Sequence, residues 1–312
     1  MRTDHLKCGS LLLVLMALLG GAEAGCSSCR GGGDATWGGE EWMAETLGGS
    51  SYGSVSPMME DSGAGDEGAA EGSEGEPSPS FITAEELRER LGAERRPIIA
   101  YVSNSPPSSG SYIEGSISLP SKGFIQADGS LKPVEELAAV LGRAGVTEED
   151  DLVLYGDCFS CGDFTFVYWI MKYLGHQKVE ILRGPAAGLP TAGSVATRPA
   201  ANYSPSPHPE LLAEYESVAS GGLVVVDART PDQFGGGHID GAVNIDFNRV
   251  IDGSWIKDDA ALAEVFAPLD PDRPIAVYSK NGGTASIVWF ALALQGRDAS
   301  LYSWNDWLRH RS

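Results

Sequence analysis

Short apolar runs alternate with helix-like patterns through most of the chain. The runs IIAYVS and LVLY, residues 98–103 and 152–155, are typical of buried strands, and a third run covers residues 275–278. Apolar positions recur with helical spacing in PVEELAAVL and FTFVYWIMKYL, residues 133–141 and 164–174. Alternating strands and helices predict an α/β fold, in which a parallel sheet carries helices on both faces.

Order is predicted to begin near Phe81. Thr83 and Glu86 have the spacing of a capping box, and Ile82 and Leu87 have that of a hydrophobic staple. These start signals predict a helix over residues 84–91.

Residues 274–286, PIAVYSKNGGTAS, predict a cradle for an anion. An apolar strand ends at Tyr278, and a helix begins near Thr284 after a Gly-rich turn. The free N–H groups of such a turn and the positive end of the helix converge on the first loop residue, Ser279. The predicted anion-binding loop consists of Ser279, Lys280, Asn281, Gly282, Gly283 and Thr284.

The same segment resembles the active-site loop of the rhodanese (sulfurtransferase) family. The resemblance lies in the spacing of Tyr278, Gly282, Ala285 and Ser286, in VVVDARTPDQFGGGHIDGAVNID upstream and in LYSWNDW downstream. It implies a rhodanese-like fold in the second half of the chain. In that family the residue after the Tyr is a cysteine that carries sulfur as a persulfide.

The resemblance also implies roles for Asp227 and Arg229, which stand at the Asp-x-Arg positions of the family. In the family such a pair mostly braces the active-site loop. Arg229 and His238 are both expected to be structural, with Arg229 the better candidate for touching an anion. The chain departs from the family at Ser279, because an alcohol stays protonated and forms no stable persulfide. The carboxy-terminal domain is therefore predicted to be inactive, with a loop that keeps its anion-holding shape.

Within residues 81–312, the first half is predicted to be a copy of the second half. Residues 98–103 align with 224–229, and residues 110–117 align with 236–243. Two tandem rhodanese-like domains are therefore expected, each with a parallel sheet and helices on both faces. Their predicted bounds are 81–195 and 203–312.

The corresponding loop of the first copy, GDCFSCGD, has Gly156 at the position of the family's nucleophile. Cys158 and Cys161 lie in the same loop beside a helix N-terminus, which favours a thiolate. Asp157 and Asp163 oppose this effect, because nearby negative charge raises the pKa of a thiol. Cys158 and Cys161 are the candidate catalytic residues.

The remaining cysteines leave alternatives open. Cys26 and Cys29 form a second pair, and each pair could close as a local disulfide in an oxidising compartment. Together the two pairs satisfy the ligand count of a four-cysteine zinc site. The wide separation of the pairs disfavours zinc, so neither a metal nor a cofactor is assigned.

The amino-terminal part predicts export. Residues 1–24 have the basic start, the apolar stretch and the small-residue cleavage site of a signal peptide. Cys26 is a candidate for lipidation, which makes the protein a candidate lipoprotein of the periplasm or cell envelope. Residues 25–80 are rich in Gly, Ser and acidic residues and predict a disordered tether.

Composition limits the partners. The net charge of −21 argues against nucleic acid, and it leaves a lipid anchor as the one route to a membrane. Three functions stay open: a sulfurtransferase in which Cys158 or Cys161 replaces the missing thiol, a catalytically inactive binding or accessory subunit of an envelope complex, and a dithiol redox protein. The expected partner is a sulfur-containing anion or thiol acceptor, or an envelope protein.

Overall fold

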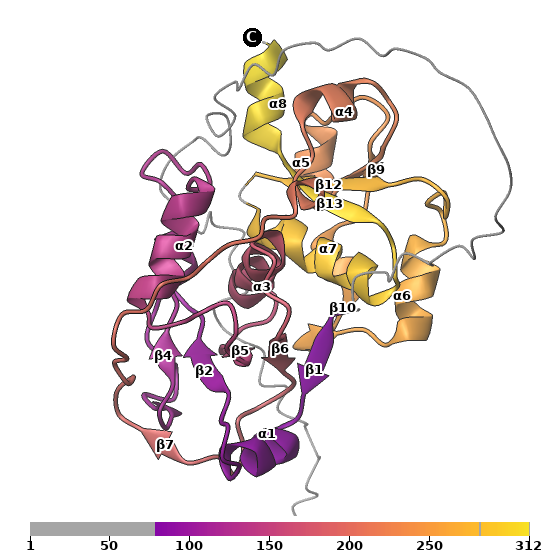
Figure 1. Ribbon diagram of the computed structural model, residues 1–312. Helices are drawn as coiled ribbons and strands as arrows, with labels where there is room; N and C mark the ends of the chain where they lie inside the picture. Colours follow the sequence, from indigo (N-terminus) through magenta and orange to yellow (C-terminus); the bar gives the residue numbers. More distant parts are fainter. Residues whose placement is uncertain (1–78, 281, 312) are drawn as a thin grey trace, which may run out of the picture. The chain divides into compact units, whose positions relative to one another are not determined.

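The computed structural model describes residues 79–280 and 282–311 (Figure 1). The predicted signal peptide, the tether and Cys26 lie outside these residues, as does Asn281. Within the described ranges, no helix has both the length and the apolar character needed to cross a bilayer.

The first half of the described region is built on a parallel sheet of five strands, in the order β1-β6-β5-β2-β4. Its strands are β1 (Ser80–Ile82), β2 (Ile98–Tyr101), β4 (Ile117–Ser118), β5 (Leu152–Tyr155) and β6 (Val179–Leu182). Its helices are α1 (Ala84–Leu91), α2 (Val134–Arg143), α3 (Asp163–Tyr173) and the 3₁₀ helix η1 (Ser121–Phe124). A small antiparallel pair, β3 (Tyr112–Ile113) and β7 (Thr191–Ala192), lies beside them.

The second half is built on a parallel sheet of four strands, in the order β13-β12-β8-β9. These are β8 (Val224–Asp227), β9 (Val243–Asn244), β12 (Ile275–Ser279) and β13 (Ala299–Ser303). The helices are α4 (Tyr215–Ala219), α5 (Pro231–Gly235), α6 (Asp259–Phe266), α7 (Gly283–Leu294), α8 (Trp304–Arg311), η2 (Pro209–Leu211) and η3 (Phe247–Val250). The hairpin strands β10 (Ile251–Asp252) and β11 (Trp255–Ile256) complete it.

The two sheets share one strand order. The series β6-β5-β2-β4 corresponds to β13-β12-β8-β9, and each central strand, β5 or β12, leads through a loop into a helix, α3 or α7. In the first sheet, β1 pairs with β6 at the outer edge. At the same edge of the second sheet, Leu212 forms a single parallel bridge with Leu301 of β13. The alternation of strands and helices along the sequence therefore predicted the α/β class correctly.

Local sequence patterns predicted the bounds of several helices and strands to within a residue or two. The capping box of α1 is formed, since the Thr83 hydroxyl accepts from the Glu86 N–H and the Glu86 carboxylate accepts from the Thr83 N–H. The prediction was wrong at Ser279, which is the last residue of β12 rather than the first of the loop. The strand runs one residue further because its pairing with β13 continues to Ser303.

The core is shared by the two halves. Helices α3 and α7 pack against each other between the sheets (Figure 1), and nearly all of their residues are buried. A helix that is apolar on every side has no solvent face. The all-round apolar sequences of α3 and α7 therefore account for their position at the centre, where their amino-terminal ends, and the loops that precede them, come close together.

Candidate functional site

The segment called the C-terminal loop below, residues 279–280 and 282–284, runs from the last residue of β12 into the first turn of α7. Ser279 is 1% exposed, and its Oγ accepts a hydrogen bond of 3.2 Å from the backbone N of Ala285. No side chain caps α7 at the N-cap position, which Gly282 occupies. The Ser279 hydroxyl therefore satisfies one of the amides at the helix start, at the position where the resemblance expects a thiol.

The other residues of the C-terminal loop differ in exposure. Lys280 is exposed, Gly282 and Gly283 are buried, and Thr284 is half-buried. Gly283 and Thr284 already belong to the first turn of α7. The positive end of this helix is present as the sequence implied, while the anion-binding role of the loop stays a prediction.

A buried ion pair, which the resemblance predicts to brace this loop, lies at the end of the neighbouring strand β8. Asp227 is fully buried, and its carboxylate accepts from Arg229 Nε at 2.9 and 3.1 Å and from Nη2 at 2.6 Å. Arg229 Nη2 also donates to the Gly237 carbonyl at 2.7 Å, and the guanidinium lies 4.2 Å from the ring centre of Trp304. These contacts hold the Arg229 guanidinium in place, while its role as a support of the loop stays a prediction.

Tyr278 links the brace to the loop. Its hydroxyl donates to Asp227 Oδ2 at 2.6 Å and accepts from the Ile239 N–H at 3.2 Å. Burial, together with the hydrogen bond to the Asp227 carboxylate, raises the pKa of Tyr278. The residue directly before Ser279 is therefore held as a neutral phenol in a closed hydrogen-bond network.

The cysteine loop, residues 156–162, joins β5 to α3 and contains a disulfide between Cys158 and Cys161. The helix N-terminus predicts a thiolate here, and the structure instead holds both sulfurs in a local disulfide, which is the alternative that the paired cysteines allow. A disulfide sulfur is not a thiolate ligand, so in this form the pair cannot contribute to a four-cysteine zinc site. Cys161 is exposed and Cys158 is half-buried.

Phe159 anchors the cysteine loop. It is 3% exposed and packs against Trp255 of β11, with ring centres 4.8 Å apart, and against Phe164 of α3 at 5.4 Å. The Phe159 carbonyl accepts from the Gly162 N–H at 3.1 Å, which closes the turn. Phe159, which directly follows Cys158, is thus part of an aromatic cluster contributed by both halves of the chain.

The two loops touch. A Cβ placed on Gly162 would lie 2.4 Å from the Gly283 carbonyl oxygen, so the backbones meet with no room for a side chain. Thr165 Oγ1 and Ser286 Oγ lie 2.8 Å apart in the first turns of α3 and α7. The disulfide loop of one half therefore lies directly against the loop of the other half that lacks the thiol.

Two acidic residues beside the cysteine pair, Asp157 and Asp163, are held by neighbouring polar groups. Asp163, the first residue of α3, accepts from Asn104 Nδ2 at 3.0 Å and from the Ser121 hydroxyl. Burial raises the pKa of this carboxyl. Asp157 accepts from the Ser108 N–H. The involvement of residues 104–121 gave no recognisable signal in the sequence, because they approach the loop only through the fold.

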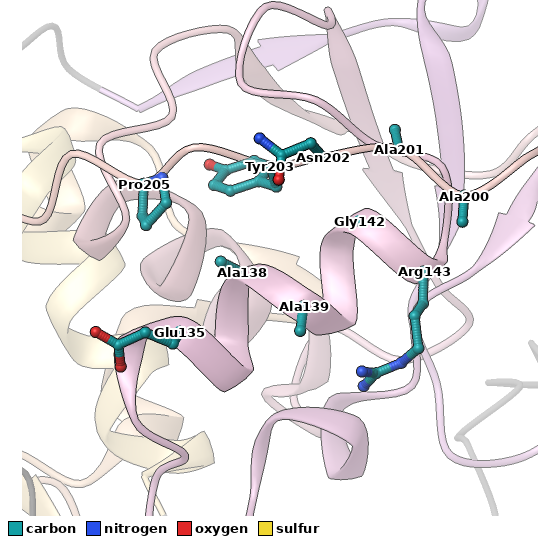
Figure 2. A pocket seen from close by; sticks show the side chains of 10 residues that line it. All are labelled: Glu135, Ala138, Ala139, Gly142, Arg143, Ala200, Ala201, Asn202, Tyr203 and Pro205. Atoms are coloured by element: carbon teal, nitrogen blue, oxygen red, sulfur yellow. The ribbon is translucent and has the colours of Figure 1, made fainter.

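A cavity of about 420 Å³ lies elsewhere, between α2 and the segment that connects the two halves (Figure 2). Its lining consists of Glu135, Ala138, Ala139, Gly142, Arg143, Ala200, Ala201, Asn202, Tyr203 and Pro205. Tyr203 also shares a hydrogen bond of 3.3 Å with Nδ1 of the buried His176. None of the lining residues belongs to either loop, so this cavity and the predicted site are separate features.

The parallel sheets and the strand–loop–helix site at the end of each central strand define an α/β protein of the rhodanese type. Residues 209–310 match the family model of the rhodanese-like domain. The carboxy-terminal half of the chain therefore carries a rhodanese-like domain.

Two relatives illustrate the similarity in sequence. The chain is 28% identical to the thiosulfate sulfurtransferase of Corynebacterium glutamicum over 214 residues, which are 56% of this chain and 70% of that protein. It is also 28% identical to a relative from Mycobacterium tuberculosis over 189 residues, which are 51% of this chain and 66% of that protein. The matched part thus spans about two thirds of each relative.

Solved structures agree with the fold. The 3-mercaptopyruvate sulfotransferase SseA of Escherichia coli superposes with a TM-score of 0.64 at 21% identity, covering 72% of this chain and 98% of SseA. The Tum1 protein of Saccharomyces cerevisiae superposes with a TM-score of 0.65 at 20% identity, covering 75% of this chain and 96% of Tum1. At these identities the likeness concerns the fold.

Proposed function

We propose that the protein is a sulfurtransferase whose sulfur acceptor is the Cys158–Cys161 pair in its reduced form. The donor would be thiosulfate or a persulfide. The proposal is carried by one observation: the cysteine pair lies against the very loop in which Ser279 replaces the thiol, with the backbones of Gly162 and Gly283 in contact. The names of relatives such as the C. glutamicum enzyme support the same chemical class.

Cys161 is the better nucleophile of the two. It is the more exposed cysteine and directly precedes Gly162, the N-cap of α3, where no side-chain cap competes for the helix amides. The positive end of a helix lowers the pKa of a nearby thiol and so favours the thiolate. The carboxylates of Asp157 and Asp163 act against this effect.

The transfer step balances with thiosulfate as donor. The Cys161 thiolate attacks the outer sulfur of thiosulfate, and the bond between the two sulfurs of the donor breaks. Sulfite leaves with the electron pair, and Cys161 is left as a persulfide. Ser279 cannot replace it in this step, because an alcohol with an ordinary pKa is a poor nucleophile without an adjacent base.

The test begins with the protein reduced by a dithiol that is then removed. Thiosulfate is added and released sulfite is measured. The expected result is one sulfite per protein for the native chain and for Ser279→Ala, and none for Cys161→Ser. Absence of sulfite from the reduced native protein would overturn the proposal.

A second function is favoured by a different observation. Ser279 is buried as a cap of α7 and the cysteines are closed as a disulfide, which suits a catalytically inactive binding or accessory subunit. This alternative predicts that thiosulfate or sulfite binds without any chemical change. Calorimetry on the oxidised protein, combined with the sulfite assay on the reduced protein, separates it from the sulfurtransferase.

We also propose that the protein is exported to the periplasm or cell envelope, with Cys26 as the site of a lipid anchor. The support is the sequence of residues 1–24 and the position of Cys26 just after it. Amino-terminal sequencing of the protein from its own cells tests cleavage. Labelling with a fatty acid, lost in Cys26→Ser, tests the anchor.

A further inference from the structure

The cysteine loop differs from a single-cysteine sulfur carrier in that its two sulfurs reach each other. The disulfide joins Cys158 to Cys161 with their Cα atoms 5.4 Å apart. From this juxtaposition we infer that the pair reduces the sulfur it accepts and releases it as hydrosulfide, instead of passing it to a separate acceptor. The inference rests on the proposed sulfur acceptance at Cys161.

The reaction follows from the position of the second cysteine. A persulfide on Cys161 has its inner sulfur where the disulfide places the sulfur of Cys161, which is within bonding reach of Cys158. Attack by Cys158 on this inner sulfur forms the disulfide and breaks the persulfide bond. The outer sulfur leaves with the electron pair and takes the proton of the Cys158 thiol, so the product is hydrosulfide.

The electrons balance within the pair. The two cysteine sulfurs lose two electrons in forming the disulfide, and the transferred sulfur gains them in becoming hydrosulfide. A new cycle requires an external dithiol reductant, which reopens the disulfide and is itself oxidised. The overall reaction converts thiosulfate and a dithiol into sulfite, hydrosulfide and a disulfide.

The surroundings of the loop favour this internal step. Phe159 is buried against Trp255 and Phe164, and the Gly162 N–H closes the turn onto the Phe159 carbonyl. A fixed turn keeps the two cysteines at a high effective concentration with respect to each other. An outside thiol must instead reach the persulfide by collision.

The exposure of the two cysteines indicates which of them reacts first. Cys161 is exposed and Cys158 is half-buried. An incoming donor or dithiol reductant therefore meets Cys161 first, and Cys158 acts as the internal, resolving thiol. This order matches the position of Cys161 beside the start of α3.

The experiment omits any reductant after the protein has been reduced, because a free dithiol would itself release hydrosulfide from a persulfide. Thiosulfate is added in excess, and sulfite, hydrosulfide and the intact mass are measured. The native protein is expected to yield one sulfite and one hydrosulfide and to end two hydrogens lighter than the reduced chain. Cys158→Ser is expected to yield one sulfite and no hydrosulfide, and to retain one added sulfur.

The outcomes separate the two proposals. Sulfite without hydrosulfide from the native protein, together with a lasting added sulfur, overturns the internal reduction and leaves the sulfurtransferase intact. No sulfite and an unchanged mass overturn both. Sulfite from Cys161→Ser but not from Cys158→Ser overturns the order of the two cysteines. Circular dichroism of each variant checks that it is folded, and Cys158→Ala repeats the Ser variant without its hydroxyl.

Discussion

The cysteine loop and the C-terminal loop follow equivalent strands and precede equivalent helices, yet they are held in place by different forces. Beside the C-terminal loop, the buried ion pair of Asp227 and Arg229 is joined to Tyr278, the residue before Ser279, through the hydrogen bond from the Tyr278 hydroxyl to Asp227. The cysteine loop is held by a disulfide and by Phe159, which is inserted into an aromatic cluster. The same strand–loop–helix arrangement thus occurs with a buried ion pair in one half, and with a disulfide and apolar packing in the other.

One interaction is common to both halves. The Tyr155 hydroxyl accepts from the Ile113 N–H at 2.9 Å, and the Tyr278 hydroxyl accepts from the Ile239 N–H at 3.2 Å. Beyond this point the networks differ, since Tyr155 pairs with the neutral hydroxyl of Ser116 and Tyr278 with a carboxylate. The shared bond lies at the end of each central strand, and the carboxylate partner belongs to the second half.

The buried ion pair and the cysteine pair therefore occur in different halves of the molecule. The C-terminal loop keeps the charged brace and has a serine at the reactive position. The first half has Tyr101 at the position of Asp227, and its cysteine loop contains the disulfide. Each prediction below tests one side of this contrast by changing matched residues in the two halves.

The largest effect is expected at the brace. Asp227→Asn leaves the buried Arg229 guanidinium without its counter-charge, and breaking a buried pair in this way costs about 3–5 kcal/mol. The matched change in the first half, Tyr101→Phe, removes one buried hydroxyl and should cost about 1 kcal/mol. Burial keeps Tyr101 neutral by raising its pKa to about 12, so no charge is lost there.

Urea unfolding followed by circular dichroism measures both variants. A loss of stability in Asp227→Asn several times that in Tyr101→Phe supports a charged brace in one half and a neutral support in the other. Equal losses would show that the ion pair contributes no more than a single hydroxyl. Arg229→Met, which removes the other charge, should also destabilise the protein strongly.

The next effect concerns the contact between the loops. Gly162 has φ of 77°, and an added Cβ would lie 2.4 Å from the Gly283 carbonyl. Gly162→Ala combines left-handed strain with a backbone clash, and we expect a loss of about 2–3 kcal/mol in unfolding free energy. At Gly283 the nearest atom to an added Cβ is the Cys161 carbonyl oxygen, at 3.6 Å.

Gly283→Ala is therefore the matched control, since an alanine fits there and helix propensity favours it by up to about 1 kcal/mol. Thermal unfolding of the two variants checks the asymmetry. Similar melting temperatures for Gly162→Ala and the native protein would mean that the loops do not meet as described.

Much of this frame was predictable from local sequence. The capping box of Thr83 and Glu86 set the start of α1, and the run LVLY matched β5 residue for residue. The pattern of Tyr278, Gly282 and Ala285 placed the second loop between a strand and a helix. These features depend on neighbours within a few residues, which is the range that hydrophobic spacing and capping signals report.

The meeting of the loops was not predictable in the same way. The contact between Gly162 and Gly283 and the insertion of Phe159 beside Trp255 join segments far apart in the chain. They arise because α3 and α7 are apolar on all sides and pack against each other. A single sequence indicates that such helices are buried, but it does not indicate which helix covers which.

The smallest expected effect tests the polar contact between the same two helices. Thr165 Oγ1 and Ser286 Oγ lie 2.8 Å apart in a buried position, so Thr165→Val and Ser286→Ala should each cost about 1–2 kcal/mol. Thr165 Oγ1 also contacts the Gly162 carbonyl and Ser286 Oγ the Gly283 carbonyl, so each single change removes one of the other residue's partners. The double variant should therefore lose less than the sum, with a coupling of about 0.5–1 kcal/mol.

Ser300 provides the control for this comparison of single and double variants. It is also buried in the second half, and its hydroxyl donates to the Ile275 carbonyl without contact to Thr165. Thr165→Val and Ser300→Ala should therefore be additive in urea unfolding. Equal coupling of Thr165 to Ser286 and to Ser300 would indicate a general loosening of the core. Coupling confined to Ser286 would instead show that the start of α3 is energetically linked to the start of α7, and with them the cysteine loop to the C-terminal loop.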